Sequence, residues 1–151
     1  MTHQFIQTLQ KDHQEVQSIL GKIQNTSEGA VKTKEDLFMQ LKQELIPHMK
    51  GEEKHFYPLL MKKKEAQELG MEAMEEHHVA EVVLKELDSL SKDAKNWKAK
   101  AKVFSEIVSH HIEEEEEEVF KTASELLSED ELDQVMSSFE SEKEAVKKKL
   151  K

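Results

Sequence analysis

The sequence has no cysteine, and its 151 residues include only four glycines and two prolines. Without thiols the chain can form no disulfide, no thiolate metal site and no cysteine-ligated iron–sulfur cluster. Any bound metal must therefore be held by nitrogen and oxygen atoms. The scarcity of glycine and proline, together with the scarcity of β-branched runs, leaves little material for turns or strands. We expect an all-α fold.

Arginine is also absent, and 32 acidic residues outweigh 22 lysines to give a net charge of -10. A strongly acidic surface repels phosphates, which argues against a nucleic-acid partner. No apolar run approaches the length of a membrane span, and the first residues lack the features of a signal peptide. We therefore expect no membrane partner and a cytoplasmic location. The length of the chain allows one modest core, so we expect a single domain over residues 1–151.

Apolar residues recur at steps of three and four, which is the period of helices that bury one face. Breakers at residues 25–29 and Gly70 divide the pattern, and Ser128 with Glu131 has the spacing of a capping box. The first helix is predicted to end near residue 24. Four further helices are predicted at about 33–64, 71–90, 93–127 and 128–150. The first four should form an up-down four-helix bundle over about 1–127. The additional C-terminal helix has no histidine and is expected to act as a lid.

An internal repeat relates the two halves of the chain. His13 and Leu20 recur 64 residues later as His77 and Leu84. Five positions of the next helix recur 63 residues later, where Leu41, Leu45, His48, Glu52 and Tyr57 correspond to Phe104, Val108, His111, Glu115 and Phe120. Each half is thus predicted to be a helix pair with one histidine on its first helix and His-x-x-x-Glu on its second, packed about a pseudo-two-fold axis.

The apolar stripes of the second and fourth helices run through these polar residues, so that His48, Glu52, His111 and Glu115 should face the core. An ionised carboxylate in an apolar interior costs several kcal/mol unless a cation compensates it. No inward lysine is evident at these levels. The pattern therefore predicts a bound metal.

Two neighbouring pairs leave the choice of histidine open, namely His77 with His78 and His110 with His111. We favour His77 and His111 because their offsets to Leu84 and Phe120 reproduce those in the first half. Six ligands in mirrored positions fit two ions better than one, with each carboxylate shared. The predicted ligands are His13, His48, Glu52, His77, His111 and Glu115. Imidazole with carboxylate suits iron, manganese or zinc.

The segments LIPHMKGEEKHFYPLL (45–60) and HHIEEEEEEVF (110–120), with the single histidines of KDH and EEH, resemble the hemerythrin-like, or HHE cation-binding, domains. The resemblance implies a non-haem di-iron centre, oxo- or hydroxo-bridged, that binds dioxygen or related small molecules. It also implies that the six residues above are the ligands. The expected partner is a diatomic molecule or a peroxide.

The chain departs from the oxygen-carrying members in two places. Glu81 stands where those proteins have a second histidine, four residues after His77, and Glu115 follows His111 by four residues instead of five. We expect Glu81 to face the core as a seventh ligand, an acceptor for an imidazole N–H or a proton carrier. These departures weaken the expectation of reversible oxygen carriage. Redox turnover of peroxide, nitric oxide chemistry and the sensing of oxygen or iron then stand as comparable alternatives. His55 and Tyr57 should lie near Glu52, as neighbours of the ligands or as packing residues.

Two other interpretations remain open. Ferritin-like di-iron bundles use Glu-x-x-His on two helices, and Glu52 with His55 and Glu75 with His78 satisfy that motif. A metal-free helical interaction module, with histidines that sense pH, is the other alternative. The sequence does not indicate an oligomeric state.

Overall fold

The fold is described from a computed structural model, in which residues 2–150 are placed well enough to describe. The N-terminal half consists of α1 (Gln4–Gln24), α2 (Val31–Gly51), the π-helical segment η1 (Glu52–Phe56) and α3 (Tyr57–Met61). After the 3-10 turn η2 (Lys64–Ala66), the second half consists of α4 (Gln67–Ser89), α5 (Trp97–Glu114), the π-helical segment η3 (Glu115–Val119) and α6 (Phe120–Leu126). The last helix is α7 (Glu129–Leu150).

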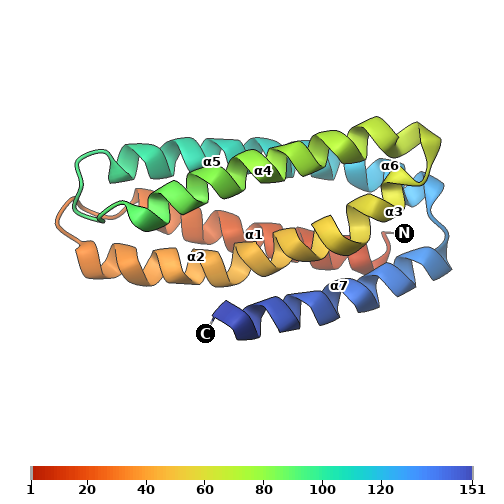
Figure 1. Ribbon diagram of the computed structural model, residues 1–151, viewed down its shortest axis with the longest axis horizontal. Helices are drawn as coiled ribbons and strands as arrows, with labels where there is room; N and C mark the ends of the chain where they lie inside the picture. The colour runs from red at the N-terminus through yellow and green to blue at the C-terminus, as the bar shows by residue number, and fades with distance from the viewer. Residues whose placement is uncertain (1, 151) are drawn as a thin grey trace.

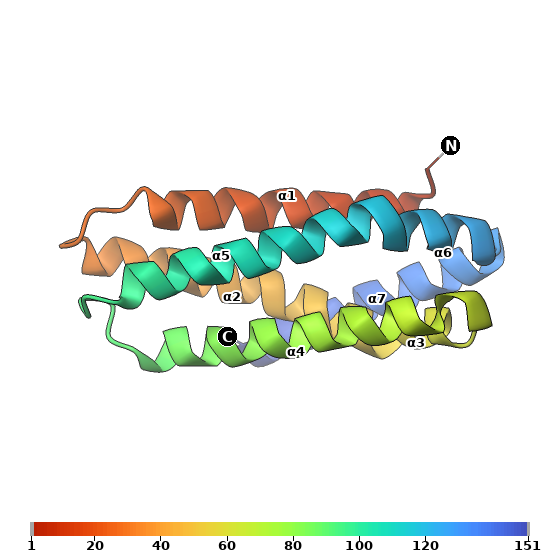
Figure 2. The same ribbon diagram turned by 90° about the horizontal axis from the view of Figure 1, so that it is seen from above.

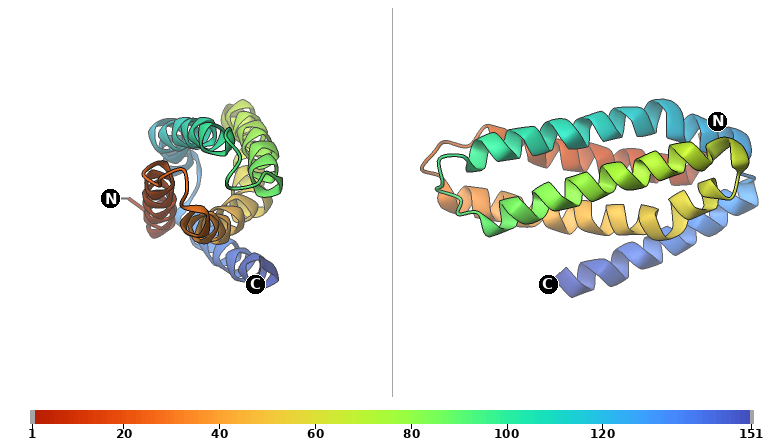
Figure 3. Two further views of the ribbon diagram at one scale, coloured as in Figure 1. Left: turned by 90° about the vertical axis from the view of Figure 1, so that its left-hand side faces the viewer. Right: turned by 45° about the horizontal axis from the view of Figure 1, so that its top comes forward.

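The elements form four long rods that run alternately up and down, as Figure 1 and Figure 2 show. Two rods are the helices α1 and α4, and two are the continuous runs α2–η1–α3 and α5–η3–α6. Seen end on, the rods stand at the corners of a square, and α7 lies outside it beside α2 (Figure 3). The predicted up-down four-helix bundle with an additional C-terminal helix is therefore confirmed.

The helix boundaries differ from the prediction mainly at the turns. Gly70 was expected to separate two helices but lies inside α4, and the chain turns earlier, around η2. An added Cβ at Gly70 would lie 2.6 Å from Cγ of Met61, so the glycine allows the close approach of α3 and α4. The fourth helix was expected to begin near Asp93 but begins at Trp97.

The interior contains two apolar clusters with a polar layer between them. One cluster lies toward the α1–α2 and α4–α5 connections and includes Phe38, Trp97 and Phe104. The other lies toward the opposite end and includes Phe5, Phe56 and Phe139. The buried histidines and glutamates come from chain positions between those of the two clusters, so apolar packing surrounds them on both sides.

The last helix begins at the predicted capping box. The Ser128 amide donates to Glu131 Oε1 at 3.0 Å, and the Glu131 amide donates to Ser128 Oγ at 3.1 Å. Phe139 packs 2.6 Å from the position that a Cβ on Gly51 would take, so this glycine allows α7 to lie close against the second rod. The expected lid lies on the outer side of the first half, where it contacts α2, η1 and α1 (Figure 3).

Among residues 2–150, no helix combines the length and the apolar character that crossing a bilayer requires.

Candidate metal centre

The six residues predicted as ligands meet in the middle of the bundle. They form two overlapping groups, whose ligand atoms lie within 4.8 Å of one another. One group contains His13, His48, Glu52 and Glu115, and the other contains Glu52, His77, His111 and Glu115. Both carboxylates belong to both groups, so each group could hold a metal ion with Glu52 and Glu115 in common.

Each glutamate of the centre begins a π-helical segment, Glu52 in η1 and Glu115 in η3. The amides of Tyr57 and Phe120 donate to the carbonyls of Glu52 and Glu115, five residues earlier, where an α-helix would use the fourth. Such widened turns are rare and occur often at functional sites. Pro58 has no amide hydrogen for an α-helical hydrogen bond, which favours the widened turn in η1. The second forms without a proline, so the common feature of the two turns is the inward glutamate.

The outer nitrogen of each of the four imidazoles meets a carboxylate. The Nδ1 distances are 2.8 Å from His13 to Glu116, 2.9 Å from His48 to Asp12, 2.8 Å from His77 to Glu53 and 2.6 Å from His111 to Glu76. These contacts fix the ring orientations and leave Nε2 of each ring facing the centre.

The sequence reasoning missed these four carboxylates, although a signal for them was present. Asp12 and Glu76 directly precede His13 and His77, while Glu53 and Glu116 directly follow Glu52 and Glu115. They therefore repeat at the same offsets as the six central residues. The internal repeat thus includes the four carboxylates that contact the imidazoles as well as the six central residues.

Among the described residues, histidines and not lysines pair with the two glutamates of the centre. Glu52 and Glu115 are fully buried, and neither forms an ion pair with a lysine. Burial opposes the charged imidazoles, yet the Glu52 and Asp12 carboxylates outweigh it and raise the pKa of His48 to about 10. Against the same opposition from burial, Glu115 and Glu76 raise the pKa of His111 to about 10.

Three of the four buried polar atoms that have no hydrogen-bond partner among residues 2–150 lie at the centre, namely Nε2 of His13, Oε2 of Glu52 and Oε1 of Glu115, and the fourth, Nε2 of Gln24, lies elsewhere at the end of α1. Nε2 of His13 lies 3.0 Å from Oε1 of Glu115, but the two atoms do not have hydrogen-bonding geometry. Unpaired buried polar atoms of this kind are costly. A cation between them would satisfy all three, so the residues fit a metal.

A model of the hemerythrin HHE cation-binding domain matches residues 4–123, which include all six central residues. The chain belongs to this family. The matched domain is described as cation-binding, and the buried His and Glu groups could hold a metal ion. Searches of curated proteins and of solved structures found no match.

The match ends at residue 123, so α7 lies outside the part of the HHE domain that it covers. Lys143 of this helix donates to both carboxylate oxygens of Asp12, at 3.0 and 2.9 Å. The Phe139 ring lies edge-on to the His48 ring, with centroids 5.7 Å apart. The last helix therefore supports the His48 side of the centre directly.

Tyr57 brings a hydroxyl into the centre of the HHE domain. The hydroxyl donates to Glu115 and also lies 3.1 Å from Oε1 of Glu52, 3.2 Å from Nε2 of His77 and 3.3 Å from Nε2 of His111. Burial and the two carboxylates raise the pKa of Tyr57 well above its usual value. The sequence reasoning left this residue as a neighbour or a packing residue, and the structure places it among the ligand atoms.

Glu81 does not lie where the sequence suggested. Its carboxylate meets Lys50 at 3.0 Å and Lys85 at 3.1 Å at the surface, and it belongs to neither central group. The inward stripe of α4 steps from His77 to Ala80, so alanine takes the position expected for Glu81. The expectation of an inward Glu81 was wrong. The roles of ligand, imidazole acceptor and proton carrier all depended on that inward position, so none of them is retained for Glu81.

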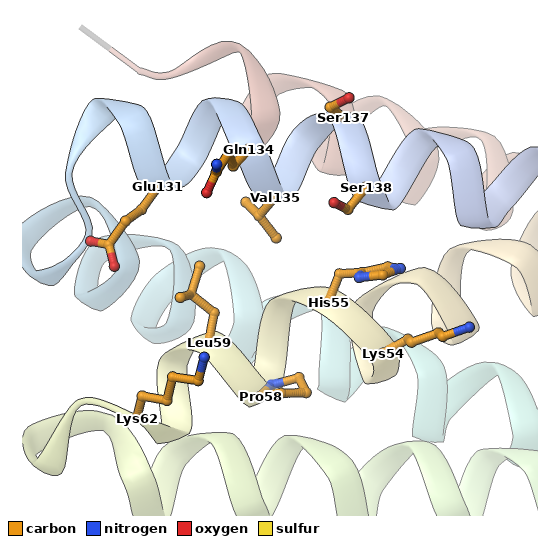
Figure 4. A pocket seen from close by; sticks show the side chains of 10 residues that line it. All are labelled: Lys54, His55, Pro58, Leu59, Lys62, Glu131, Gln134, Val135, Ser137 and Ser138. Carbon is orange, nitrogen blue, oxygen red and sulfur yellow. The ribbon is translucent and has the colours of Figure 1, made fainter.

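The ferritin-like alternative also fails on position. His55 points away from the centre into an outer groove between α7 and the second rod, where Lys54, Pro58 and Ser138 also lie (Figure 4). Its Nε2 is 3.7 Å from Oε1 of Glu142. His78 is exposed on α4. Neither Glu-x-x-His motif therefore places its histidine near the buried glutamates.

Proposed function

We propose that this chain holds two iron ions and uses them to bind or react with dioxygen, peroxide or nitric oxide. The observation that carries the proposal is the pair of overlapping groups in which Glu52 and Glu115 are shared. Two adjacent iron ions would supply exchangeable electrons and open positions for a small ligand. The choice of iron over manganese or zinc rests on the resemblance to hemerythrins, because the donor atoms suit all three.

Different residues would bind the ions, orient the imidazoles and donate a proton at this centre. His13 and His48 would hold one ion and His77 and His111 the other, with Glu52 and Glu115 between them. The four carboxylates on the Nδ1 atoms would keep each ring in place during ligand exchange. The hydroxyl of Tyr57 would donate to an oxygen atom in the centre or bind an ion of the His77 pair.

A small cavity beside the histidines supports a small ligand. Its volume is about 20 Å³, and its lining combines the histidines with aliphatic side chains such as Val16, Leu45 and Val108. A space of this size accepts a molecule similar to water. Its apolar lining suits an uncharged diatomic molecule and excludes larger substrates.

The test is anaerobic loading of the purified protein with ferrous iron, followed by metal analysis and optical spectroscopy during addition of dioxygen, hydrogen peroxide or nitric oxide. We expect two equivalents of iron and a spectral change with at least one of the three. A change that reverses when the gas is removed indicates carriage or sensing, while consumption of the added molecule indicates an enzyme. No bound iron would favour the metal-free interaction module, and bound iron that is inert to all three would refute the proposed reactivity.

A further inference from the structure

Three metal-ligating side chains gather outside the buried centre, on its His111 side. They are Glu76 of α4 and His110 and Glu114 of α5, and their ligand atoms lie within 4.8 Å of one another. Nε2 of His110 is 3.4 Å from Oε1 of Glu114. The side chains of Glu76, His110 and Glu114 are 22%, 67% and 35% exposed, so the group is open to solvent. None of the three belongs to the six central residues.

The internal repeat shows what the equivalent place in the first half contains. The counterparts of Glu76, His110 and Glu114 are Asp12, Pro47 and Gly51. There α7 covers the surface, because Phe139 packs on Gly51. The same helix places the ammonium of Lys143 on both oxygens of Asp12, at 3.0 and 2.9 Å. At this place in the first half, the carboxylate that orients a central histidine is thus bound to a cation.

In the second half no helix lies over the equivalent surface among residues 2–150, and Glu76 forms no ion pair with a lysine there. The adjoining groove between α4 and α5 adds three more carboxylates, those of Glu72, Glu75 and Glu106. Its remaining lining is mainly aliphatic. Among the described residues, the place that holds a lysine in the first half therefore has no lysine in the second, where Glu76 pairs with His111 and has the His110 imidazole and a further carboxylate beside it.

We propose that Glu76, His110 and Glu114 bind a third divalent metal ion at the surface. One imidazole nitrogen and two carboxylates are ligands that suit zinc, ferrous iron, manganese and cobalt, and the exposed side of the site leaves room for water ligands. Glu76 also accepts from Nδ1 of His111 at 2.6 Å, so an ion bound here contacts a group that orients a ligand of the buried centre. The proposal does not depend on which metal fills that centre.

The test is a zinc titration of the full-length chain, with His110→Ala and Glu114→Gln as variants. Calorimetry and metal analysis after gel filtration would give the number of bound ions and their affinities. We expect wild type to bind one ion more than each variant, or to bind that ion at least about tenfold more tightly. Because the result is a difference between wild type and variants, it stands whatever number of ions the buried centre takes.

The controls are chosen from the same surroundings. His78→Ala removes an exposed histidine that also adjoins a central ligand, and Glu106→Gln removes a carboxylate of the same groove that lies outside the triad. Both should keep the additional ion. Equal zinc binding by wild type and the two triad variants would overturn the proposal, as would an equal loss in the His78 or Glu106 controls, which would indicate adventitious binding to an acidic surface. His110 is mostly exposed, so its replacement should leave the circular dichroism spectrum unchanged.

Discussion

Tyr57 and Phe120 occupy equivalent positions in the two halves, but only Tyr57 brings a hydroxyl into the centre, 3.2 Å from Nε2 of His77. Phe120 instead stacks on His13, with ring centroids 5.8 Å apart and planes 6° from parallel. The two groups are therefore chemically different even though their histidines and glutamates correspond. This asymmetry gives the His77 side one more oxygen donor than the His13 side.

Tyr57→Phe should make the two positions alike. In the metal-free protein the change removes a hydroxyl that donates to buried carboxylates, and the free energy of unfolding should fall by about 1.5 to 3 kcal/mol. In the metal-loaded protein the loss should be smaller if the carboxylates are then satisfied by cations. Urea unfolding of wild type and variant, with and without metal, measures both values. An equal loss in the two forms would contradict this account of the carboxylates.

Glu52→Gln and Glu115→Gln should each lower the bound metal below two equivalents, because each replaces a shared carboxylate by a neutral amide. Glu117→Gln is the matched control, since Glu117 lies exposed in the same run of glutamates as Glu115. Metal analysis after anaerobic iron loading gives the counts. Two equivalents in both variants would rule out the bridging role.

Lys143→Met should weaken the His48 side of the centre without removing a ligand. The change deletes the ammonium that holds Asp12, whose carboxylate meets Nδ1 of His48 at 2.9 Å. Loss of such a supporting contact is expected to reduce metal affinity by roughly tenfold. Competition with a chelator measures the change, and Lys148→Met, on the exposed side of α7, serves as the control. An affinity equal to that of wild type would show that α7 does not support the centre.

Metal binding should release protons and strengthen with rising pH. Burial works against their charged forms, but neighbouring carboxylates raise the pKa of His48 and of His111 from 6.5 to about 10. The metal-free protein therefore carries protons at neutral pH on rings that must be neutral when they bind a metal. Titration in two buffers of different ionisation enthalpy counts the released protons. Binding without proton release would contradict the raised pKa values.

The same shifts predict how the stability of the metal-free protein depends on pH. The folded-state pKa of each ring lies above its unfolded value of about 6.5, so protonation stabilises the fold fully below that value. The contribution is lost as the pH rises through about 10. The free energy of unfolding of the metal-free protein should therefore fall across this window, and the fall should be smaller with metal bound. Urea unfolding at several pH values measures both trends.

Gly51→Ala should destabilise the contact between α7 and the second rod. The added Cβ would lie 2.6 Å from Cδ1 of Phe139, so the ring or the helix must move at a cost of about 1 to 3 kcal/mol. Gly21→Ala is the control, because nothing lies within 4 Å of its added Cβ. That change should stabilise α1 by about 0.5 to 1 kcal/mol, since alanine is the better helix former. Chemical unfolding of both variants tests the opposite signs.

The sequence determined the helical class, the internal repeat and the inward position of the histidines and glutamates that the structure brings together. It did so because apolar periodicity fixes which face of a helix is buried, and because the repeat distinguishes His77 from His78 and His111 from His110. Ser128 and Glu131 were equally readable, since a capping box is a local contact.

Only the tertiary structure decided which of two adjacent positions at the edge of a stripe faces the centre. Ala80 and Glu81 both follow His77 by about one turn, and the packing of α4 places Ala80 inward while Lys50 and Lys85 hold Glu81 at the surface. The contact of Lys143 with Asp12 joins residues 131 positions apart, and no periodicity encodes it. Helical spacing fixes the direction of a side chain only to within part of a turn. Packing against the neighbouring helices then determines which of two adjacent residues faces the centre.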